Sequence, residues 1–561
     1  MASFGRELLE AALSANGTLE GSSPLCPGAL QPGALTPDAL TPDALTHVAE
    51  IPARTGKPRP WPEWVSPEVL RAFANRGISA PWSHQVQAAE LAHAGRHVVV
   101  STGTASGKSL AFQLPIIAAL QAEPHGRALY LSPTKALGHD QLRSAHALLA
   151  ELPSLADAGL CAYDGDAPEE VRRFARERSR WLFSNPDMIH RSLLRNHARW
   201  AVFLRGLRYI VVDECHYYRG IFGSNVAMVL RRLLRLCEQY SPADQPGPTV
   251  IFASATTASP GSTAGELIGQ TVAEVTEDGS PHGSRTVALW EPPLRTDVVG
   301  ENGAPVRRSA GNDAARIMAE LVSQGARTLT FVRSRRGAEL VALGARERLQ
   351  DIAPQLCQTI ASYRAGYLAE DRRALERSLS EGELRGLATT NALELGIDIA
   401  GLDAVLLAGF PGTLASFWQQ AGRSGRRGQG ALIVLIARDD PLDTYLVHNP
   451  AALLDKPLER VVIDPRNRYV LGPQLLCAAA ELPLDEGEVR RWDADAVADA
   501  LVDDGLLRRR GTKFYPVAGL EAHGAVDIRG FTGGQVAILE SGTGRVLGST
   551  AAGQAPASIH P

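Results

Sequence analysis

Short apolar runs alternate with stretches of helical periodicity along most of the chain. From about Pro81, the first set of runs lies at 97–102 (HVVVST), 127–133 (RALYLSP), 208–214 (RYIVVDE) and 249–256 (TVIFASAT). A second set lies at 327–334 (RTLTFVRS), 384–390 (LRGLATT), 402–410 (LDAVLLAGF) and 430–437 (GALIVLIA). Strands that alternate with helices in this way are typical of parallel sheets covered by helices. The pattern therefore predicts an α/β protein with two such sheets in tandem, the second ending near Arg438.

Two stretches interrupt the periodic pattern. Residues 21–61 are dominated by Pro, Gly, Ala and Thr and include the short repeat LTPDALTPDALT at 35–46. Such a composition buries too little apolar surface to offset chain entropy, so we expect a flexible lead-in and a repeat without function. A stretch rich in Gly, Pro and Ser follows at 276–312. We therefore predict a flexible segment 1–61, an α/β domain 62–278, a linker 279–312, a second α/β domain 313–448 and an accessory region 449–561.

The accessory region has a different pattern. At 492–517 (WDADAVADALVDDGLLRRRGTKFYPV) an amphipathic helix leads into two short strands around Gly511 and Thr512. A helix followed by a short hairpin fits a winged helix, although other small α+β modules share this order. The expected fold is thus two tandem parallel-sheet domains followed by a winged-helix-like α+β segment.

Composition narrows the class of protein. The chain has 561 residues with 57 basic and 61 acidic side chains, a net charge of −4, which excludes a histone-like polycation but leaves room for one basic groove. Six cysteines without a CxxC pair indicate a reducing compartment, with neither a disulfide scaffold nor a zinc knuckle. No apolar run approaches the ~18 residues of a membrane span, and the N-terminus lacks the features of a secretory signal. We expect a cytoplasmic protein without a membrane partner.

A strand, a loop of small residues and a helix follow one another at 98–114 (VVVSTGTASGKSLAFQL). Such a loop directs backbone N–H groups to one point at a helix N-terminus, which suits a phosphate chain. Lys108 would place a cation at the β- and γ-phosphates, and Ser109 would offer a hydroxyl to Mg²⁺. The spacing GxxxxGK[ST] is missed at Thr102, and a tight turn is the alternative. The loop itself comprises Thr102, Gly103, Thr104, Ala105, Ser106 and Gly107.

The scarcity of lysine favours the phosphate interpretation. The chain has only five lysines beside 52 arginines, and two of them, Lys108 and Lys135, follow strands at the start of helices. Arginine cannot replace the compact charge of lysine in a tight phosphate cradle.

Two adjacent carboxylates, Asp213 and Glu214, follow the apolar run at 209–212. Like charges repel there, so a purely structural role is rare, although strand-end acids that face solvent are the alternative. Beside bound Mg²⁺, Asp213 would hold the shell of the ion and Glu214 would orient and deprotonate an attacking water.

Four motifs together resemble those of superfamily 2 helicases of the DEAD/DEAH kind: GTASGKS at 103–109, DECH at 213–216, SAT at 254–256 and QQAGRSGRRG at 419–428. Their order and spacing match over 83–430. The stretches at 213–233 and 464–484 most resemble the YprA-like branch of DNA-repair helicases, which includes mitomycin repair factor A and whose fungal relatives are similar to RecQ helicases. The resemblance implies two RecA-like domains, ATP and Mg²⁺ as cofactors, DNA as the track and 3′→5′ travel.

The resemblance also implies roles for individual residues. Gln85 would read the adenine edge and Asp398 would contact the nucleotide, while Arg423 and Arg426 would act as arginine fingers with Glu214, Lys108 and Asp213 as the other catalytic residues. The nucleotide state would be coupled to the strand through His216, Ser254, Thr256 and Gln419. The nucleic-acid backbone would be contacted by Thr134, Lys135, Asn185, Arg333 and Thr390.

The sequence departs from this branch after Cys477, where no further cysteine occurs. Members usually end in a cysteine-rich metal-binding domain, so we expect a truncated or naturally shortened member. Asn225 stands where relatives often carry His. Two rival functions remain: an RNA-dependent ATPase with the same core, and a DNA-binding recruitment module with a weak motor. A DNA-repair nuclease or another repair protein is an expected partner besides single-stranded and duplex DNA, and the oligomeric state is left open.

Overall fold

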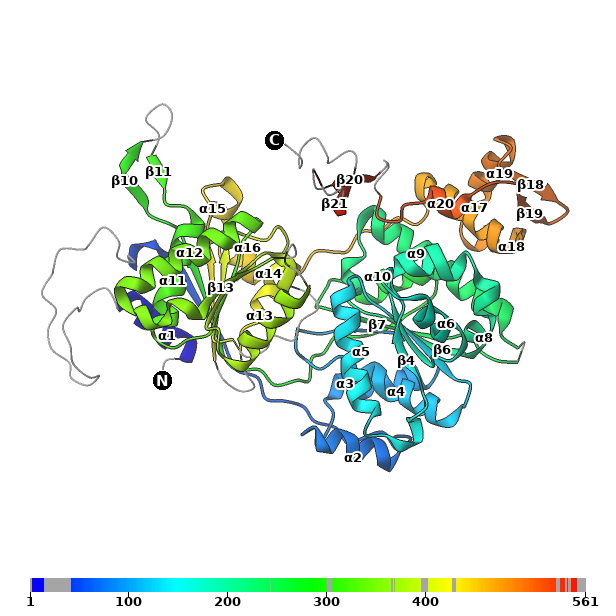
Figure 1. Ribbon diagram of the computed structural model, residues 1–561, viewed down its shortest axis with the longest axis horizontal. Helices are drawn as coiled ribbons and strands as arrows, with labels where there is room; N and C mark the ends of the chain where they lie inside the picture. Colours follow the sequence, from blue (N-terminus) through cyan, green and yellow to red (C-terminus); the bar gives the residue numbers. More distant parts are fainter. Residues whose placement is uncertain are drawn as a thin grey trace, which may run out of the picture.

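The computed structural model describes residues 3–14, 42–242, 244–299, 305–364, 367, 369–394, 402–425, 430–530, 535–539, 542 and 546–551. Two α/β domains lie side by side, and a smaller C-terminal domain packs against the first of them (Figure 1). The architecture of two parallel-sheet domains followed by a helix-and-hairpin domain is confirmed.

Seven parallel strands form the first sheet, in the order β4-β5-β3-β6-β7-β2-β8. They are β2 (Val98–Ser101), β3 (Arg127–Leu131), β4 (Leu160–Ala162), β5 (Trp181–Ser184), β6 (Leu207–Val212), β7 (Thr249–Ser254) and β8 (Ala273–Val275). β2, β3, β5 and β7 are buried along their whole length. Strands that are covered on both faces read as continuous apolar runs, which is why the sequence pattern located them.

Helices cover both faces of this sheet. One face carries α2 (Pro67–Asn75), α3 (Ser83–His93), α4 (Ser109–Ala122) and α5 (Lys135–Leu149). The other carries α6 (Glu169–Glu177), α7 (Pro186–Met188), α8 (Ala201–Gly206), α9 (Gly220–Tyr240) and α10 (Pro260–Ile268). Side chains alternate between the two cores, with Val98 and Val100 on the first face and Val99 on the second.

The second sheet also has seven strands, in the order β1-β9-β16-β15-β12-β14-β13, with β1 antiparallel to β9 and the others parallel. They are β1 (Leu45–Ile51), β9 (Arg285–Trp290), β12 (Thr328–Phe331), β13 (Ile360–Tyr363), β14 (Gly386–Thr389), β15 (Ala404–Ala408) and β16 (Ala431–Ile436). One face packs on α1 (Phe4–Ser14), α11 (Ala310–Ser323) and α12 (Arg335–Ile352). The other packs on α13 (Ala369–Glu381), α14 (Leu414–Ala421), α15 (Pro441–His448) and α16 (Ala451–Leu454). A hairpin of β10 (Leu294–Val299) and β11 (Pro305–Arg307) projects from this domain (Figure 1).

Two segment predictions differ from the structure. Within 1–61, which we expected to be flexible, α1 buries Leu9 and Ala12 in the second core, and β1 is an edge strand of the second sheet. Within 279–312, expected as a linker, β9 lies between β1 and β16. Averaged composition hides the apolar positions of LTHVAEI and RTVALW, and these strands become stable only within the sheet, where β1 pairs with β9 and β9 also pairs with β16. Helix α1 and strand β1 therefore belong to the second domain, and the chain crosses between the domains after β1 and again after β8 (Val275).

The C-terminal domain confirms the predicted helix and hairpin. It contains α17 (Arg468–Glu481), β17 (Leu484–Asp485), α18 (Glu486–Arg491), α19 (Asp495–Asp503), β18 (Leu507–Arg510), β19 (Lys513–Pro516) and α20 (Ala522–Ala525). β18 and β19 pair across Gly511, whose φ of 59° suits glycine, and β17 completes a three-stranded sheet. Leu475, Trp492 and Phe514 form the centre of its core. A further hairpin, β20 (Gln535–Leu539) and β21 (Val546–Ala551), follows.

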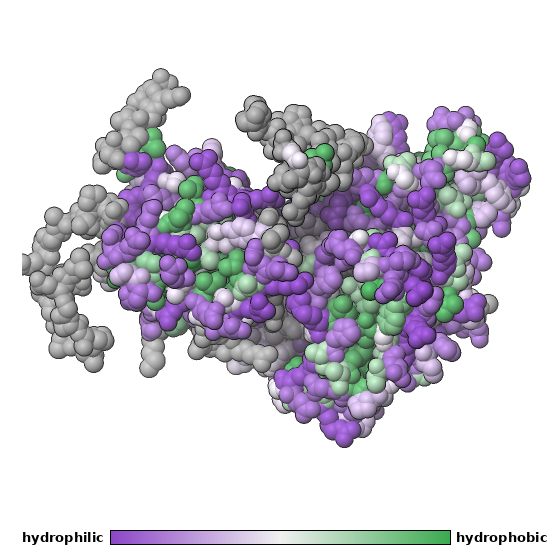
Figure 2. All heavy atoms as spheres, viewed as in Figure 1, coloured by the Kyte–Doolittle hydropathy of each residue, from purple (hydrophilic) through white to green (hydrophobic). Residues whose placement is uncertain are grey.

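The face of the molecule shown in Figure 2 is mostly hydrophilic, with small separate hydrophobic areas. Within the described ranges, no helix has the length and apolar character that crossing a membrane requires.

Candidate functional site

A cleft of about 1450 Å³ lies between the two sheets. From the first sheet it is lined by the loops that follow β2, β6 and β7, which places it at the carboxyl ends of those strands. From the second domain it is lined by the end of α14 and the residues after it, Gly422 to Gly425. Ligands of open α/β sheets bind at the carboxyl ends of the strands, so this cleft is the candidate active site.

The predicted phosphate loop forms the floor of this cleft, between β2 and α4. Its backbone is left-handed at Ala105 (φ 60°) and Gly107 (φ 77°). Lys108 Nζ donates to the carbonyls of Thr102 (3.1 Å) and Gly103 (2.9 Å), so the lysine lies across the loop. The loop therefore has the predicted strand-to-helix position.

Thr102, the departure from the usual spacing, contributes to the closed shape of the loop. Its buried hydroxyl lies 2.7 Å from the hydroxyl of Ser106, and the two are hydrogen-bonded across the loop. Ser109 begins α4, and its hydroxyl donates to Gln141 Oε1 at 3.3 Å while facing the cleft.

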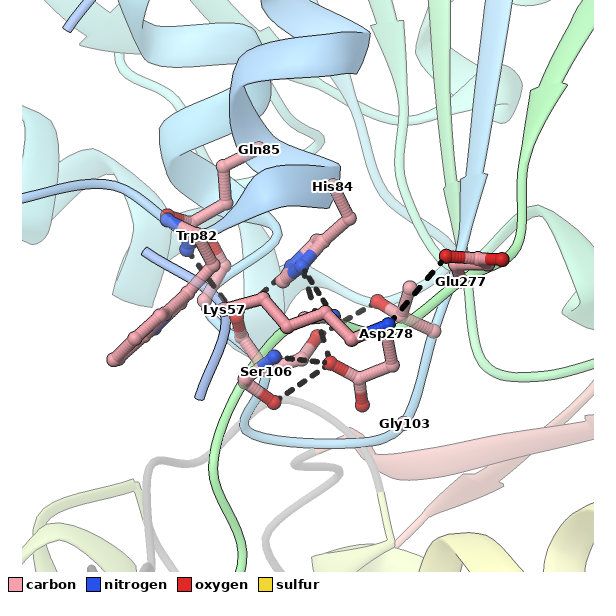
Figure 3. Close-up of polar contacts among 12 residues, drawn as sticks. Lys57, Trp82, His84, Gln85, Gly103, Ser106, Glu277 and Asp278 are labelled. Carbon is pink, nitrogen blue, oxygen red and sulfur yellow. Dashed lines mark hydrogen bonds and ion pairs between the residues drawn. The ribbon is translucent and has the colours of Figure 1, made fainter. Parts of the chain in front are cut away.

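Gln85 supports the loop. Its side chain is buried, and its amide N–H₂ donates to the carbonyls of Ser106 (3.2 Å) and Gly107 (2.9 Å), while its amide oxygen accepts from the N–H of Trp82 (2.7 Å) (Figure 3). A Cβ at Gly107 would lie 2.5 Å from the Gln85 amide nitrogen, which explains the glycine. Both amide hydrogens are used, so only the amide oxygen has capacity left for a base. The adenine contact of Gln85 stays a prediction.

The two acids follow β6 and face the loop. The Asp213 carboxylate accepts from the buried Tyr130 hydroxyl at one oxygen and from the Glu214 N–H (2.9 Å) at the other. Glu214 has a left-handed backbone, φ 48° and ψ 45°, which costs a non-glycine residue ~1–3 kcal/mol and persists only where the surroundings enforce it. The Tyr130 hydroxyl and the Glu214 N–H therefore hold the Asp213 carboxylate from two sides.

Burial raises the pKa of both acids, and charge repulsion contributes at Asp213. Burial, with the neighbouring Glu214 charge, raises the pKa of Asp213 to about 6. Burial also raises the pKa of Glu214, against the opposing effect of Lys108 and Arg423. Glu214 Oε2 is buried and has no hydrogen-bond partner among the residues described, although His216 Nδ1 lies 3.4 Å from it. Two buried carboxylates beside a phosphate loop are suited to a divalent cation and a water molecule. Asp213 and Ser109 would supply the oxygen ligands of that cation.

His216 joins this strand end to the second domain. Its Nδ1 accepts from the N–H of Ala255 (3.3 Å) and lies 3.3 Å from Ser254 Oγ. Nε2 therefore carries the proton and donates to Gln419 Oε1 on α14 at 3.3 Å. Burial lowers the pKa of His216 to about 4, so the ring is neutral near pH 7. Three of the predicted coupling residues thus form one connected chain.

The remaining residues predicted at the cleft lie on its walls. Thr256 is exposed and lines it from the first domain. Arg423 lines it from the second domain, and its guanidinium donates to the Glu394 carbonyl at 2.5 Å. Gly422 touches the loop of the opposite sheet: a Cβ there would overlap the Thr104 hydroxyl. Arg426 and Asp398 lie outside the described residues.

The predicted nucleic-acid contacts all follow carboxyl ends of strands. Thr134 and Asn185 come after β3 and β5 and cap α5 and α7 through side-chain bonds to Leu137 N–H (3.3 Å) and Met188 N–H (3.0 Å). Lys135 is half exposed and pairs with Asp166 at 2.6 Å.

In the second domain, Arg333 follows β12 and donates to the Phe410 carbonyl at 3.0 Å. Thr390 follows β14 and caps the next turn. Each sheet thus carries its predicted contacts on its own carboxyl edge, while their grip on a strand stays a prediction.

Sequence reasoning missed two buried residues that contact residues of the site without lining the cleft themselves. Tyr130 reads as one more apolar position of β3, and nothing in its run indicates that the hydroxyl reaches Asp213. His84 directly precedes Gln85 in the sequence, but its hydrogen-bond partner Gly279 is 195 residues away. Only the fold brings these two residues together.

Three family models match the chain: "DEAD/DEAH box helicase" over residues 82–262, "Helicase conserved C-terminal domain" over 313–428, and "ATP-dependent helicase HRQ1, winged helix domain" over 463–531. Their order follows the two sheets and the C-terminal domain. The third match confirms the winged helix.

Relatives agree with these models. ATP-dependent helicase HRQ1 of Saccharomyces cerevisiae is 40% identical over 447 residues, 78% of this chain and 40% of that protein. The uncharacterized ATP-dependent helicase YprA of Bacillus subtilis is 36% identical over 470 residues, 83% of this chain and 61% of that protein. The chain thus spans about two to three fifths of the length of these curated relatives.

Among solved structures, the DUF1998 helicase MrfA bound to DNA is similar, with a TM-score of 0.82 and 33% identity over 91% of this chain and 71% of that chain. The family models, these relatives and the cleft geometry agree, and the chain belongs to the superfamily 2 DEAD/DEAH box helicases, in the branch of HRQ1, YprA and MrfA.

Proposed function

We propose that the protein is an ATP-dependent DNA motor that moves 3′→5′ along a strand and acts in DNA repair. One observation carries the proposal: a single cleft brings together the phosphate loop and acidic pair of one sheet and Arg423 of the other. Phosphoryl transfer needs positioning and charge stabilisation on opposite sides of the γ-phosphate. Two sheets that supply these groups separately can only complete the site by approaching each other, which links hydrolysis to domain movement.

Each group has a defined task in this mechanism. Lys108 leaves the loop carbonyls of Thr102 and Gly103 and pairs with the β- and γ-phosphates. Mg²⁺, held through Asp213 and Ser109, would neutralise charge on the same phosphates. Glu214, which has a raised pKa and a buried oxygen without a hydrogen bond among the described residues, orients the attacking water and accepts its proton.

The second domain completes the site and reports its state. Arg423 stabilises the charge that develops on the γ-phosphate, and loss of that phosphate weakens the attraction between the domains. His216 passes the change from the acidic strand end to Ser254 and to Gln419 on α14. The carboxyl edges of the two sheets would then bind and release the nucleic-acid strand in alternation.

DNA is the proposed track. The similar MrfA structure contains bound DNA, and the winged helix of this chain offers three consecutive exposed arginines, Arg508 to Arg510, on β18 beside the hairpin turn. Backbone contacts of this kind are independent of sequence and sensitive to salt. A repair nuclease or another repair protein is the proposed partner. The five described cysteines are free thiols, which supports a reducing, cytoplasmic setting.

The test is steady-state ATP hydrolysis by the purified chain with no polymer, with single-stranded DNA and with single-stranded RNA, followed by unwinding of duplexes with 3′ or 5′ tails. The proposal predicts stimulation by DNA and unwinding of 3′-tailed duplexes. Stimulation by RNA alone would support RNA remodelling instead. DNA binding without any stimulated turnover would support the recruitment module.

A further inference from the structure

The two connections between the sheets are paired with each other. After β1 the chain returns to the first domain through residues 52–58, and after β8 it leaves again through 276–284. Arg54 and His282 exchange backbone hydrogen bonds of 2.9 and 3.1 Å, and Lys57 N–H donates to the Gly279 carbonyl at 2.8 Å. We refer to residues 54–57 with 278–282 as the joint.

Side chains reinforce the joint. The Arg54 guanidinium donates twice to the Ser280 carbonyl, at 2.8 and 3.0 Å, and pairs with Asp278 at 2.9 Å. The exposed pair Lys57–Glu277, at 3.7 Å, lies alongside. The two connections are thus fastened to each other by backbone and charge, so they move as one unit.

The joint is also attached to the start of α3. Ser83 N–H donates to the Lys57 carbonyl at 2.9 Å, and a Cβ at Gly279 would overlap the Ser83 hydroxyl. Gly279 N–H donates to His84 Nδ1 at 3.1 Å. The first turn of α3 therefore carries the joint on one side and, through Gln85, the phosphate loop on the other.

His84 connects these two sides directly. The side chain is fully buried, and its Nε2 lies 3.1 Å from the Ser106 carbonyl. Because Gly279 N–H can only donate, Nδ1 is unprotonated; Nε2 therefore carries the hydrogen and donates to Ser106. Figure 3 shows the ring between Ser106 and the connecting segment at Asp278. Asp278 itself approaches the other end of the loop, 3.3 Å from where a Gly103 Cβ would stand.

We propose that His84 is a positioning residue that transmits the occupancy of the phosphate loop to the joint between the two sheets. Bound phosphates attract Lys108 away from the Thr102 and Gly103 carbonyls, which changes the conformation of the phosphate loop. Ser106 is part of this loop and moves with it. The rigid His84 ring is hydrogen-bonded to Ser106 on one side and to Gly279 on the other. When Ser106 moves, both hydrogen bonds persist only if Gly279 moves with it. The inference rests on the proposed function, since it requires a nucleotide in the loop.

The experiment is hydrogen exchange of the full chain with and without Mg²⁺ and AMP-PNP, followed in the loop (102–109) and in the segment 276–284. Two variants each keep one of the two bonds: His84→Asn retains an acceptor near Nδ1, and His84→Gln retains a donor near Nε2. His93→Gln, at the exposed end of the same helix, is the matched control. Melting temperatures and analogue affinity are measured for all four proteins.

We expect the wild type and the control to show protection in both segments on adding AMP-PNP. In both His84 variants the loop stays protected and analogue affinity is kept, while the nucleotide-dependent change in 276–284 falls by ~5-fold or more, a coupling of the usual size. DNA-stimulated turnover falls with it. A purely structural role would lower the melting temperature without separating the two segments.

Three results overturn the inference. One is an unchanged response of 276–284 in both variants. Another is a wild type in which AMP-PNP protects the loop and leaves 276–284 unaffected, which rejects the role of His84 while ATP binding stands. A wild-type loop that AMP-PNP does not protect rejects the proposed function itself.

Discussion

Replacing Glu481 with glutamine would leave a buried guanidinium without its counter-charge. Arg232 on α9 of the first domain is fully buried and forms an ion pair with Glu481 at the end of α17, whose side chain is also fully buried. Gln474 accepts from the same guanidinium at 2.6 Å, and His523 Nε2 lies 2.9 Å from Glu481 Oε1. This buried cluster is thus one of the contacts that anchor the winged helix to the first domain, beside the Arg235–Glu488 ion pair.

The magnitude follows from the ionisation of Glu481. Burial acts to raise its pKa, but Arg232 and the bond from His523 outweigh it and lower the pKa from 4.5 to about 2. At ~1.36 kcal/mol per pH unit this is ~3 kcal/mol, which agrees with the ~3–5 kcal/mol lost when one partner of a buried pair is removed. Since the folded pKa is depressed, the stabilisation is complete above about pH 4.5 and is lost as the pH falls toward 2.

The assay is hydrogen exchange of α17 at neutral pH, which measures local opening. Glu481→Gln should increase opening by ~100-fold, the equivalent of ~3 kcal/mol. The matched control is Glu486→Gln, in the same domain, because Glu486 is partly exposed and pairs with Arg490 and Arg509 at the surface. That change should cost less than ~1 kcal/mol. Equal exchange in the two variants would refute the anchoring role of the buried pair.

Three further changes test the cleft. Tyr130→Phe removes a hydrogen bond to Asp213 and should weaken Mg²⁺-dependent nucleotide binding by ~10-fold, as for other residues that orient metal ligands, with metal-free nucleotide binding as the control. Gly422→Ala places a methyl group against the phosphate loop of the opposite sheet, so DNA-stimulated turnover should fall while nucleotide affinity is kept; unchanged turnover would argue against this contact in the working state. Gln419→Ala removes the partner of His216 and should lower DNA stimulation more than basal hydrolysis, and an equal loss of both would reject the coupling role.

The sequence predicted those parts of the site whose signal is local. Lys108 and the acidic pair each follow an apolar run, so their place at carboxyl ends of strands follows from the local pattern alone. Arg423 entered through the family resemblance, and the fold then brought it to the same cleft. The winged helix was predictable because its helix and hairpin are contiguous.

The contacts that depend on distant partners were not predictable. β1 joins the second sheet only through β9, more than two hundred residues away, and β9 lies between β1 and β16, so the place of both strands depends on partners outside their own turn-rich stretches. The role of His84 depends on Gly279, and that of Tyr130 on the position of β6 beside β3. The contact of Gln85 with a base stays a prediction, while its amide hydrogens donate to the Ser106 and Gly107 carbonyls, bonds that only the folded loop makes visible.

The most direct test of the central claim is DNA-stimulated ATP hydrolysis by Glu214→Gln beside the wild type. If the cleft is an ATPase site with Glu214 as the base, turnover falls by ~10²–10⁴-fold, the usual contribution of a general base, while affinity for ATP is kept. Wild-type turnover in the variant would show that hydrolysis does not proceed through this carboxylate and would contradict the account.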